Sequence, residues 1–352
     1  MQPATTIKNE SALRTVPPAE VDSRQSPSRS RILIGLCVVG LVAAGTVASF
    51  LPRPSPEFPA SAAQPHLMLI NGAAQAAGKH LVAAGELGHL FYSAGVDQPW
   101  SEARVTPPRG STLTQVFFAD KSLGLAVGHD NWILRSEDGG LSWQETHFDA
   151  TAAEALMSVW GGAQGPLFAT GSFGRFLVSD DRGKTWQPRD TGLGDRHFYG
   201  IAGADKQHLM LVGESGLVAR SADGGQSWER LPEFYNGSFF GLIALSASDW
   251  LVYGMRGKVF RTGDFGATWK EIDADTSLSL YGGTRSRYGR VVLVGEGGVV
   301  TQSNDGGLTF KRLNDGGAGS LSSVAELADG RLIFTGQSGI SVPGAPAESQ
   351  IP

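Results

Sequence analysis

The chain has 352 residues, of which 41% are hydrophobic, and a formal net charge of −5 at pH 7. This length can bury a substantial core, whereas the acidic charge excludes nucleic acid as the expected partner, because a surface that binds nucleic acid is basic. The single cysteine, Cys37, excludes a disulfide framework.

The N-terminal residues predict a membrane anchor. Residues 1–31 are polar and rich in Ser, Thr, Pro and Arg, which predicts a disordered tail. Ile32–Leu51 is a run of roughly twenty uncharged residues, the length of a single transmembrane helix. Three arginines closely precede this run and only Arg53 closely follows it. The positive-inside rule therefore predicts a cytoplasmic tail, an inner-membrane span and a periplasmic remainder.

A cleaved signal peptide is the alternative for the same run. Small residues at Ala60-Ser61-Ala62 could form its cleavage site, although 31 preceding residues make a long leader. Residues 52–66 carry several prolines and are predicted to be a stiff linker.

Between residues 67 and 342 the sequence repeats with a period of roughly 42 residues. One motif is Ser/Thr-x-Asp-x-Gly-x-Ser/Thr followed by Trp or Phe. It starts at Ser136, Ser179, Ser221, Thr262 and Ser303, with a degenerate copy at Ser93. A Gly-x-x-Gly motif precedes each copy, with Asn131 replacing the second glycine once, and a seventh Gly-x-x-Gly begins at Gly336.

Each repeat contains four short runs of apolar and β-branched residues separated by turn residues, which predicts a four-stranded antiparallel meander. Seven such units predict an all-β, seven-bladed β-propeller over residues 67–342. Helix pairs can share this period, but 48 glycines and the lack of a helical apolar stripe disfavour them. The last repeat has only three runs, so we expect residues just before Leu67 to complete it. Residues 343–352 are predicted to be a disordered tail.

The motif aspartates are predicted to be structural. A short carboxylate can accept hydrogen bonds from the backbone of its own turn, and the following Trp can pack between blades. The aspartates concerned are Asp138, Asp181, Asp223, Asp264 and Asp305. Catalytic or calcium-binding roles are the alternatives, but no copy has the EF-hand ligand series.

This is the Asp-box pattern. Coupled to Gly-x-x-Gly, it resembles the Ycf48-like family of photosystem II stability and assembly factors and their bacterial relatives, most fully at Gly213–Trp228. The resemblance implies a seven-bladed lumenal or periplasmic propeller that acts as an assembly scaffold and binds other proteins. A photosystem partner is not implied. Asp-boxes also occur in sialidases, other glycosidases and sortilin-like receptors, so they indicate fold better than function.

The predicted strand order places the Gly-x-x-Gly turns and the links between blades on one face, where we expect a partner to bind. Two adjacent links are rich in aromatic residues, as in a protein-binding hot spot. The residues predicted there are Arg175, Arg196, Phe198, Tyr199, Phe234, Tyr235, Phe239 and Phe240, and a second, basic patch is predicted at Arg256, Arg285, Arg287 and Arg290. The alternatives are ordinary core packing for the aromatic residues and a solvated loop face for the arginines.

Two functions remain open. The first is a membrane-anchored, non-catalytic scaffold for a membrane complex, with no cofactor and no metal. The second is a sialidase-like or other glycoside hydrolase, or a glycan-binding lectin. Asp130, Glu214 and Glu296 could share a face, as a carboxylate pair requires. No catalytic residue is predicted, because no spacing favours one, and the histidines show no metal-ligand spacing.

Overall fold

The computed structural model describes residues 29–50, 63–76, 78–151, 154–314, 316–317 and 319–343. The chain divides into two units, Met1–Ser61 and Ala62–Pro352. In the first unit a helix, α1 (Arg29–Phe50), overlaps the predicted span. Among the described residues, however, no helix is both long and apolar enough to cross a bilayer. Most of the predicted tails and linker lies outside the described residues.

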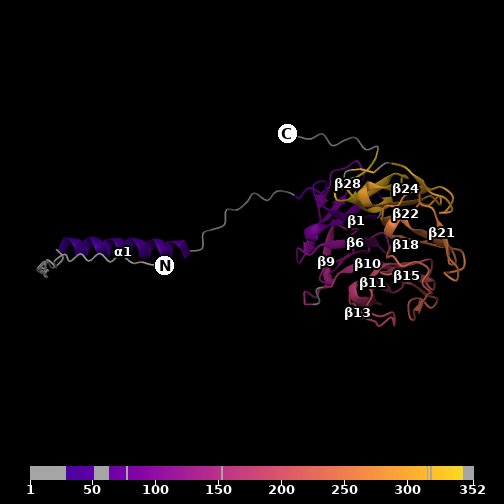
Figure 1. Ribbon diagram of the computed structural model, residues 1–352, viewed down its shortest axis with the longest axis horizontal. Coiled ribbons are helices and arrows are strands. Elements are labelled where there is room, and N and C mark those ends of the chain that lie inside the picture. The colour runs from indigo at the N-terminus through magenta and orange to yellow at the C-terminus, as the bar shows by residue number, and fades with distance from the viewer. Residues whose placement is uncertain are drawn as a thin grey trace, which may run out of the picture. The chain divides into compact units, whose positions relative to one another are not determined.

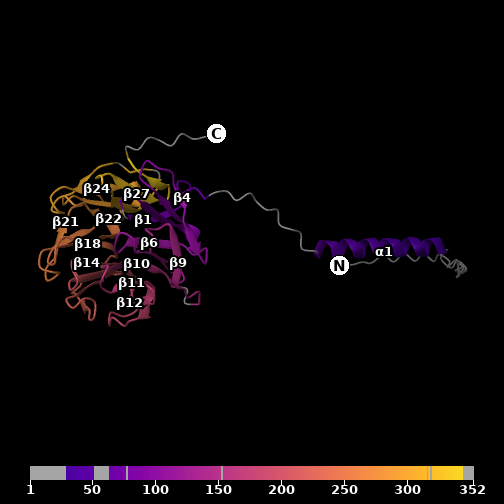
Figure 2. The same ribbon diagram turned by 180° about the vertical axis from the view of Figure 1, so that it is seen from behind.

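The second unit contains seven β-sheets within its described residues, which we number as blades 1–7 in chain order (Figures 1 and 2). Blade 1 consists of β1 (Ile70–Gln75), β2 (Leu81–Gly85), β3 (Leu90–Ser93) and β4 (Ser101–Glu102). Blade 2 consists of β6 (Leu113–Phe118), β7 (Gly124–Gly128), β8 (Ile133–Ser136) and β9 (Ser142–His147), joined by β5 (Arg104–Thr106). Blade 3 consists of β10 (Leu156–Gly161), β11 (Leu167–Gly171), β12 (Phe176–Ser179) and β13 (Gln187–Pro188).

The other four blades follow the same plan. Blade 4 consists of β14 (Phe198–Gly203), β15 (Leu209–Gly213), β16 (Val218–Ser221) and β17 (Glu229–Arg230). Blade 5 consists of β18 (Phe239–Ala244), β19 (Trp250–Gly254), β20 (Val259–Thr262) and β21 (Lys270–Ile272). Blade 6 consists of β22 (Leu280–Arg285), β23 (Val291–Gly295), β24 (Val300–Ser303) and β25 (Lys311–Arg312). Blade 7 consists of β26 (Leu321–Glu326), β27 (Leu332–Gly336) and β28 (Gly339–Ser341).

The blades close into a ring with their first strands innermost. The first strand of each blade contacts the first strand of the next, and β26 of the last blade contacts β1 of the first. Within each blade, consecutive strands pair in antiparallel order. Four Gly-x-x-Gly turns form short 3-10 helices: η1 (Glu86–Gly88), η2 (Ser172–Gly174), η3 (Met255–Gly257) and η4 (Glu296–Gly298). The predicted seven-bladed propeller is confirmed.

Packing between blades explains the sequence pattern. The second strands of blades 1–6 are buried along their whole length, as in β15, because a neighbouring blade covers each side of the sheet. The aromatic residue that ends each complete Asp motif packs toward the preceding blade. Trp143, for example, lies among Val82 and Leu90 of blade 1. Burying a side chain of this size contributes on the order of 2–3 kcal/mol.

Two features depart from the predicted blade. The strand β5 pairs in parallel with β9, so the chain leaving blade 1 adds an edge strand to blade 2. Blade 7 has three strands within the described residues. A fourth was expected just before Leu67, where the described residues 63–66 form no strand. They nevertheless lie at the seam: a β-carbon on Gly339 would lie 2.2 Å from the Pro65 oxygen, and Ala63 packs in a cluster with Ile340.

Candidate protein-binding face

The ring has two different faces, as predicted. On one, which we call the Gly-turn face, the Gly-x-x-Gly turns bond to the links between blades: the Gly174 N–H donates to the Arg196 carbonyl at 2.8 Å. On the other, the Asp-turn face, the Asp motifs bond to the turns between first and second strands. There the Gly224 N–H donates to the Gln207 carbonyl at 3.1 Å.

The carboxylate of each motif aspartate accepts hydrogen bonds within its own turn. In blade 3, Asp181 Oδ1 accepts the N–H groups of Lys184 at 3.0 Å and Thr185 at 2.9 Å and the hydroxyl of Ser179 at 2.8 Å. Its Oδ2 accepts the Thr185 hydroxyl at 2.7 Å. These bonds, the Thr185 hydroxyl first, lower the pKa of Asp181 to about 2. The other four aspartates bond to the same two motif hydroxyls in their turns, so a structural role accounts for all five.

The first strands enclose a central channel of about 480 Å³. At its Gly-turn end, a register shift in each first strand leaves the second residue unpaired with the neighbouring strand. A β-bulge of this kind redirects the side chain that it carries. Seven such residues, one per blade, line the channel: Asn71, Thr114, Met157, Tyr199, Phe240, Tyr281 and Ser322.

The aromatic members of this set are neighbours. The rings of Tyr199 and Phe240 meet edge-on with centroids 5.5 Å apart, and those of Phe240 and Tyr281 are also 5.5 Å apart. We call Tyr199, Phe240 and Tyr281 the aromatic arc; they belong to blades 4, 5 and 6. In blades 1 and 2 the equivalent polar side chains instead bond to the next blade, Asn71 to the Leu113 carbonyl and Thr114 to the Leu156 carbonyl. The channel mouth is therefore aromatic on one side and polar on the other.

An exposed aromatic residue extends the arc outward. The Phe173 ring lies 4.7 Å from that of His197, which lies 6.2 Å from Tyr199. Phe173 is 61% exposed and has φ 52°. A left-handed backbone costs an ordinary side chain roughly 1 kcal/mol, and an exposed ring recovers little of that by packing. A bulky apolar residue held this way is therefore a candidate contact for a partner.

The structure corrects part of the predicted aromatic patch. Phe198 and Phe239 are 0% exposed, so these two cannot contact a partner. They are the residues just before the bulges, and they face the core. Phe234 and Tyr235 are half-buried: Phe234 stacks on Trp269 with centroids 5.0 Å apart, and the Tyr235 hydroxyl donates to the Met255 carbonyl at 3.1 Å. Only Tyr199 and Phe240 of the predicted aromatic residues belong to the arc.

The predicted basic patch does not form one surface. Arg256 lies in the Gly-x-x-Gly turn of blade 5. Arg285 and Arg287 lie at the Asp-turn end of blade 6, where Arg285 donates to the Leu245 carbonyl at 2.5 Å and Arg287 donates to the Ala328 carbonyl. Arg290 likewise donates to the Gly330 carbonyl. These three arginines join neighbouring blades.

The two remaining predicted arginines lie on the Gly-turn face and are engaged by the chain itself. Arg175 forms an ion pair with Glu154, and Arg196 Nη1 donates to the Ser215 carbonyl at 3.1 Å.

Carboxylates on the Gly-turn face also have local partners. Asp130 Oδ2 accepts the Ser111 hydroxyl at 2.6 Å, and Glu296 Oε2 accepts the Ser279 N–H at 3.1 Å. Glu214 Oε2 lies 3.7 Å from His197 Nε2. Each comes from a different blade. Within the described parts of the chain, no group of three or more His, Cys, Asp or Glu side chains could hold a metal ion.

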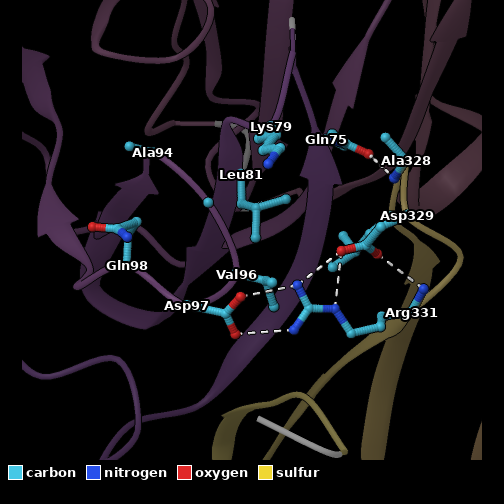
Figure 3. A pocket seen from close by; sticks show the side chains of 12 residues that line it. Gln75, Lys79, Leu81, Ala94, Val96, Asp97, Gln98, Ala328, Asp329 and Arg331 are labelled. Carbon is cyan, nitrogen blue, oxygen red and sulfur yellow. Dashed lines mark hydrogen bonds and ion pairs between the residues drawn. The ribbon is translucent and has the colours of Figure 1, made fainter.

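A second cavity, of about 500 Å³, lies between blades 1 and 7 (Figure 3). Arg331 of blade 7 reaches Asp97 of blade 1 at 2.9 Å and also contacts Asp329 at 2.8 Å. Gln75 Oε1 accepts the Ala328 N–H at 2.7 Å across the same gap. The charged groups here neutralise one another, so this cavity marks the seam where the ring closes.

Comparison with known families agrees with this architecture. Residues 194–340 match the family model "Photosynthesis system II assembly factor YCF48", and residues 177–188 match the model "BNR/Asp-box repeat". The Photosystem II assembly lipoprotein Ycf48 of Synechococcus sp. (strain CC9902) is 32% identical over 119 residues, which are 32% of this chain and 35% of that relative. The match thus spans about a third of the relative's length.

Solved structures show the same fold. A structure titled "YCF48 bound to D1 peptide" has a TM-score of 0.65 at 18% identity, covering 82% of this chain and 98% of that one. YCF48 from Cyanidioschyzon merolae has a TM-score of 0.62 at 14% identity, covering 80% and 95%. A GH74 xyloglucanase from Xanthomonas campestris has a TM-score of 0.60 at 13% identity, covering 80% and 52%. Enzymes and non-enzymes therefore share this architecture, and similarity at these identities establishes the fold alone.

Proposed function

We propose that this chain, which belongs to the Ycf48-like family of Asp-box/BNR repeat proteins, is a membrane-tethered, non-catalytic scaffold that binds a protein partner from a membrane complex. The observation that carries the proposal is the aromatic arc with Phe173 beside it. Exposed aromatic residues clustered on a rigid rim are typical of the anchors of protein interfaces.

The relatives support a polypeptide partner. One relative is described as a photosystem II assembly lipoprotein, and one solved relative binds a D1 peptide. For this chain we propose the same kind of activity, the binding of a segment of a membrane protein during assembly.

A non-catalytic role fits the carboxylates of the Gly-turn face. Asp130 and Glu296 accept hydrogen bonds from their own blades, as structural groups do. A glycoside hydrolase needs two carboxyl groups facing one bond across roughly 5–10 Å, whereas Asp130, Glu214 and Glu296 belong to three different blades. Glycan binding is retained as the alternative outcome of the test.

The tether is part of the proposal and rests on the sequence of Ile32–Leu51, which has no charged residue. We propose that it places the N-terminus in the cytoplasm and the propeller on the periplasmic side. An alkaline phosphatase fusion after Ser341 should then be active in cells, because this enzyme folds in the periplasm. An inactive but intact fusion would contradict this orientation.

Affinity purification of the full chain from detergent-solubilised membranes tests the binding face. We expect Phe173→Asn and Tyr281→Ser each to reduce recovery of a specific partner at least about tenfold, since aromatic anchors commonly dominate binding. Neither change should unfold the ring. Asparagine tolerates a left-handed backbone, and serine occupies the Tyr281 position in blade 7, as Ser322.

Leu308→Ser is the matched control, because Leu308 is 52% exposed in an Asp turn on the opposite face. Equal loss of the partner in this variant would contradict the assigned face. Retention of the partner in both test variants would overturn the proposal. Specific binding on a glycan panel, without a co-purified protein, would favour the alternative.

A further inference from the structure

Two carboxylates lie beside the aromatic arc and bear on the kind of group that it accepts. Burial and then the charge of Glu214 raise the pKa of the Tyr199 hydroxyl, and burial and then the charge of Glu296 raise that of Tyr281. Both glutamates follow the first glycine of their Gly-x-x-Gly turns, in blades 4 and 6. The arc is thus flanked by negative charge on both sides of Phe240.

A tyrosine in the channel wall supplies a further hydrogen-bonding group. Tyr253 in β19 is 4% exposed, yet it lines the central channel. A β-carbon on Gly241 would lie 2.2 Å from its hydroxyl oxygen, so a glycine is needed here for the hydroxyl to fit. Within the described residues no side-chain hydrogen bond involves that hydroxyl, and its oxygen is not among the side-chain atoms shut off from solvent. It can therefore bond to water or to a polar group that enters the channel.

A third acidic group lines the same channel at its other end. The side chain of Glu326, in β26, is 8% exposed. Its Oε2 makes no hydrogen bond within the described residues, but it forms an ion pair with Arg290 at 3.9 Å. Buried carboxylates favour a positively charged neighbour. Arg290 thus offsets the charge of Glu326, and the negative charge beside the aromatic arc comes from Glu214 and Glu296.

We propose that the aromatic arc is a receptor for one cationic side chain, an arginine or a lysine, of the partner polypeptide. The inference rests on the proposed function and names the chemistry of its binding site. The ring faces of Tyr199, Phe240 and Tyr281 attract a cation through their quadrupoles. Glu214 and Glu296 add charge attraction, and the Tyr253 oxygen can accept an N–H from a group that enters the channel.

The cations of the Gly-turn face are neutralised to different extents. Arg175 forms an ion pair with Glu154, whereas Arg196 donates to the neutral carbonyl of Ser215 and keeps its charge. Arg256 lies in the turn of blade 5, but the charges that shift the pKa values of Tyr199 and Tyr281 are those of Glu214 and Glu296. An anionic group would meet the two glutamates, and a purely apolar group would leave the Tyr253 hydroxyl unsatisfied.

The test uses the purified full chain in detergent and short blocked peptides whose central residue alone varies. The probes carry arginine, lysine, citrulline or glutamate between glycine and serine residues. Citrulline has the shape of arginine without its charge. In saturation-transfer NMR titrations, we expect the arginine and lysine peptides to bind about tenfold more tightly than the citrulline peptide, with contacts at the side-chain methylene protons.

Conservative variants assign the effect to named groups. Phe240→Leu removes the ring but keeps an apolar side chain, as Met157 does at this position in blade 3. Glu296→Gln removes the charge but keeps the acceptor for the Ser279 N–H, because Gln337 accepts the equivalent Ser320 N–H in blade 7 at 2.9 Å. Tyr253→Phe removes only the hydroxyl. Each variant should weaken arginine-peptide binding several-fold with an unchanged melting temperature.

Glu86→Gln is the matched control. Glu86 holds the same turn position in blade 1 and accepts the Leu69 N–H at 3.1 Å, but its channel neighbour is Asn71 rather than an aromatic residue. Equal binding of the arginine and citrulline peptides, tighter binding of the glutamate peptide, or equal weakening by Glu86→Gln would overturn the inference. If Phe173→Asn still abolishes partner recovery in that case, the proposed function stands and only the cationic specificity is wrong.

Discussion

At the scale of single residues, one carboxylate organises each Asp turn. Asp181 accepts two backbone N–H groups and two hydroxyls, which replaces the hydrogen bonds that a tight turn cannot make within itself. The neighbouring Asp180 has the same charge and is exposed. Position relative to the turn, not charge alone, therefore decides the role of each aspartate.

The first residue-scale prediction compares these neighbours. Asp181→Ala should lower the free energy of unfolding by about 1 kcal/mol, because the lost hydrogen bonds lie in an exposed turn where water replaces part of them. Asp180→Ala should change it little. Urea denaturation measures both values. Equal effects would contradict the structural role of Asp181.

The pKa values of the turn aspartates predict how stability depends on pH. Hydrogen bonds lower the pKa of Asp181, Asp223 and Asp264 to about 2, below the value of about 3.9 in an unfolded chain. Their stabilisation is fully present above the unfolded pKa and is lost as the pH falls through the folded pKa. The melting temperature should therefore fall progressively from about pH 4 toward about pH 2. Asp181→Asn should make this fall shallower, and an unchanged slope would count against the assignment.

At the scale of elements, the first strand of each blade shows what sequence could and could not predict. Its existence, direction and burial follow from apolar and β-branched residues between turn motifs. The position of the bulge does not follow from this residue pattern, because a bulge depends on how the strand pairs with the next one. That bulge separates Phe198, which is buried, from Tyr199, which lines the channel.

Residue composition alone also failed to predict which side chains reach the channel and which face each arginine occupies. Tyr281 lies in β22, after a link that contains no aromatic residue, so composition gave no signal. Alignment of the seven repeats on their first glycines could have found it, because Tyr199, Phe240 and Tyr281 share one repeat position. The sequence predicts one basic patch for Arg256, Arg285 and Arg287, whereas a strand and its turn place Arg285 and Arg287 on the face opposite to Arg256.

At the scale of the whole molecule, the repeat predicted the number of blades and the division into two faces, because each blade buries its sides only against its neighbours. Closure is the part of the architecture that no single repeat encodes. The seam lies between blade 7 and blade 1, where Arg331 meets Asp97 (Figure 3). Residues 63–66 lie beside β28 at the same seam. Chain segments separated by most of the sequence hold the ring closed there.

Deletion of residues 58–66 tests closure directly. We expect a markedly lower melting temperature, because the deletion removes the contacts of Pro65 and His66 with Gly339 and that of Ala63 with the Ile340 cluster. The measurement is a thermal melt of the purified full chain with and without this segment. An unchanged melting temperature would show that these residues do not help to close the ring.

Coupling between the deletion and Arg331 distinguishes ring closure from simple loss of contacts. If both stabilise one seam, Arg331→Gln should have a smaller effect in the deleted chain than in the intact one, because an opened seam no longer depends on either contact. The Lys258–Glu271 ion pair within blade 5 has similar exposure but does not cross the seam. Lys258→Gln should therefore add independently to the deletion. Thermal melts of the three single and two double variants measure both couplings, and additive effects of Arg331→Gln would mean that the ring closes without cooperation between its two ends.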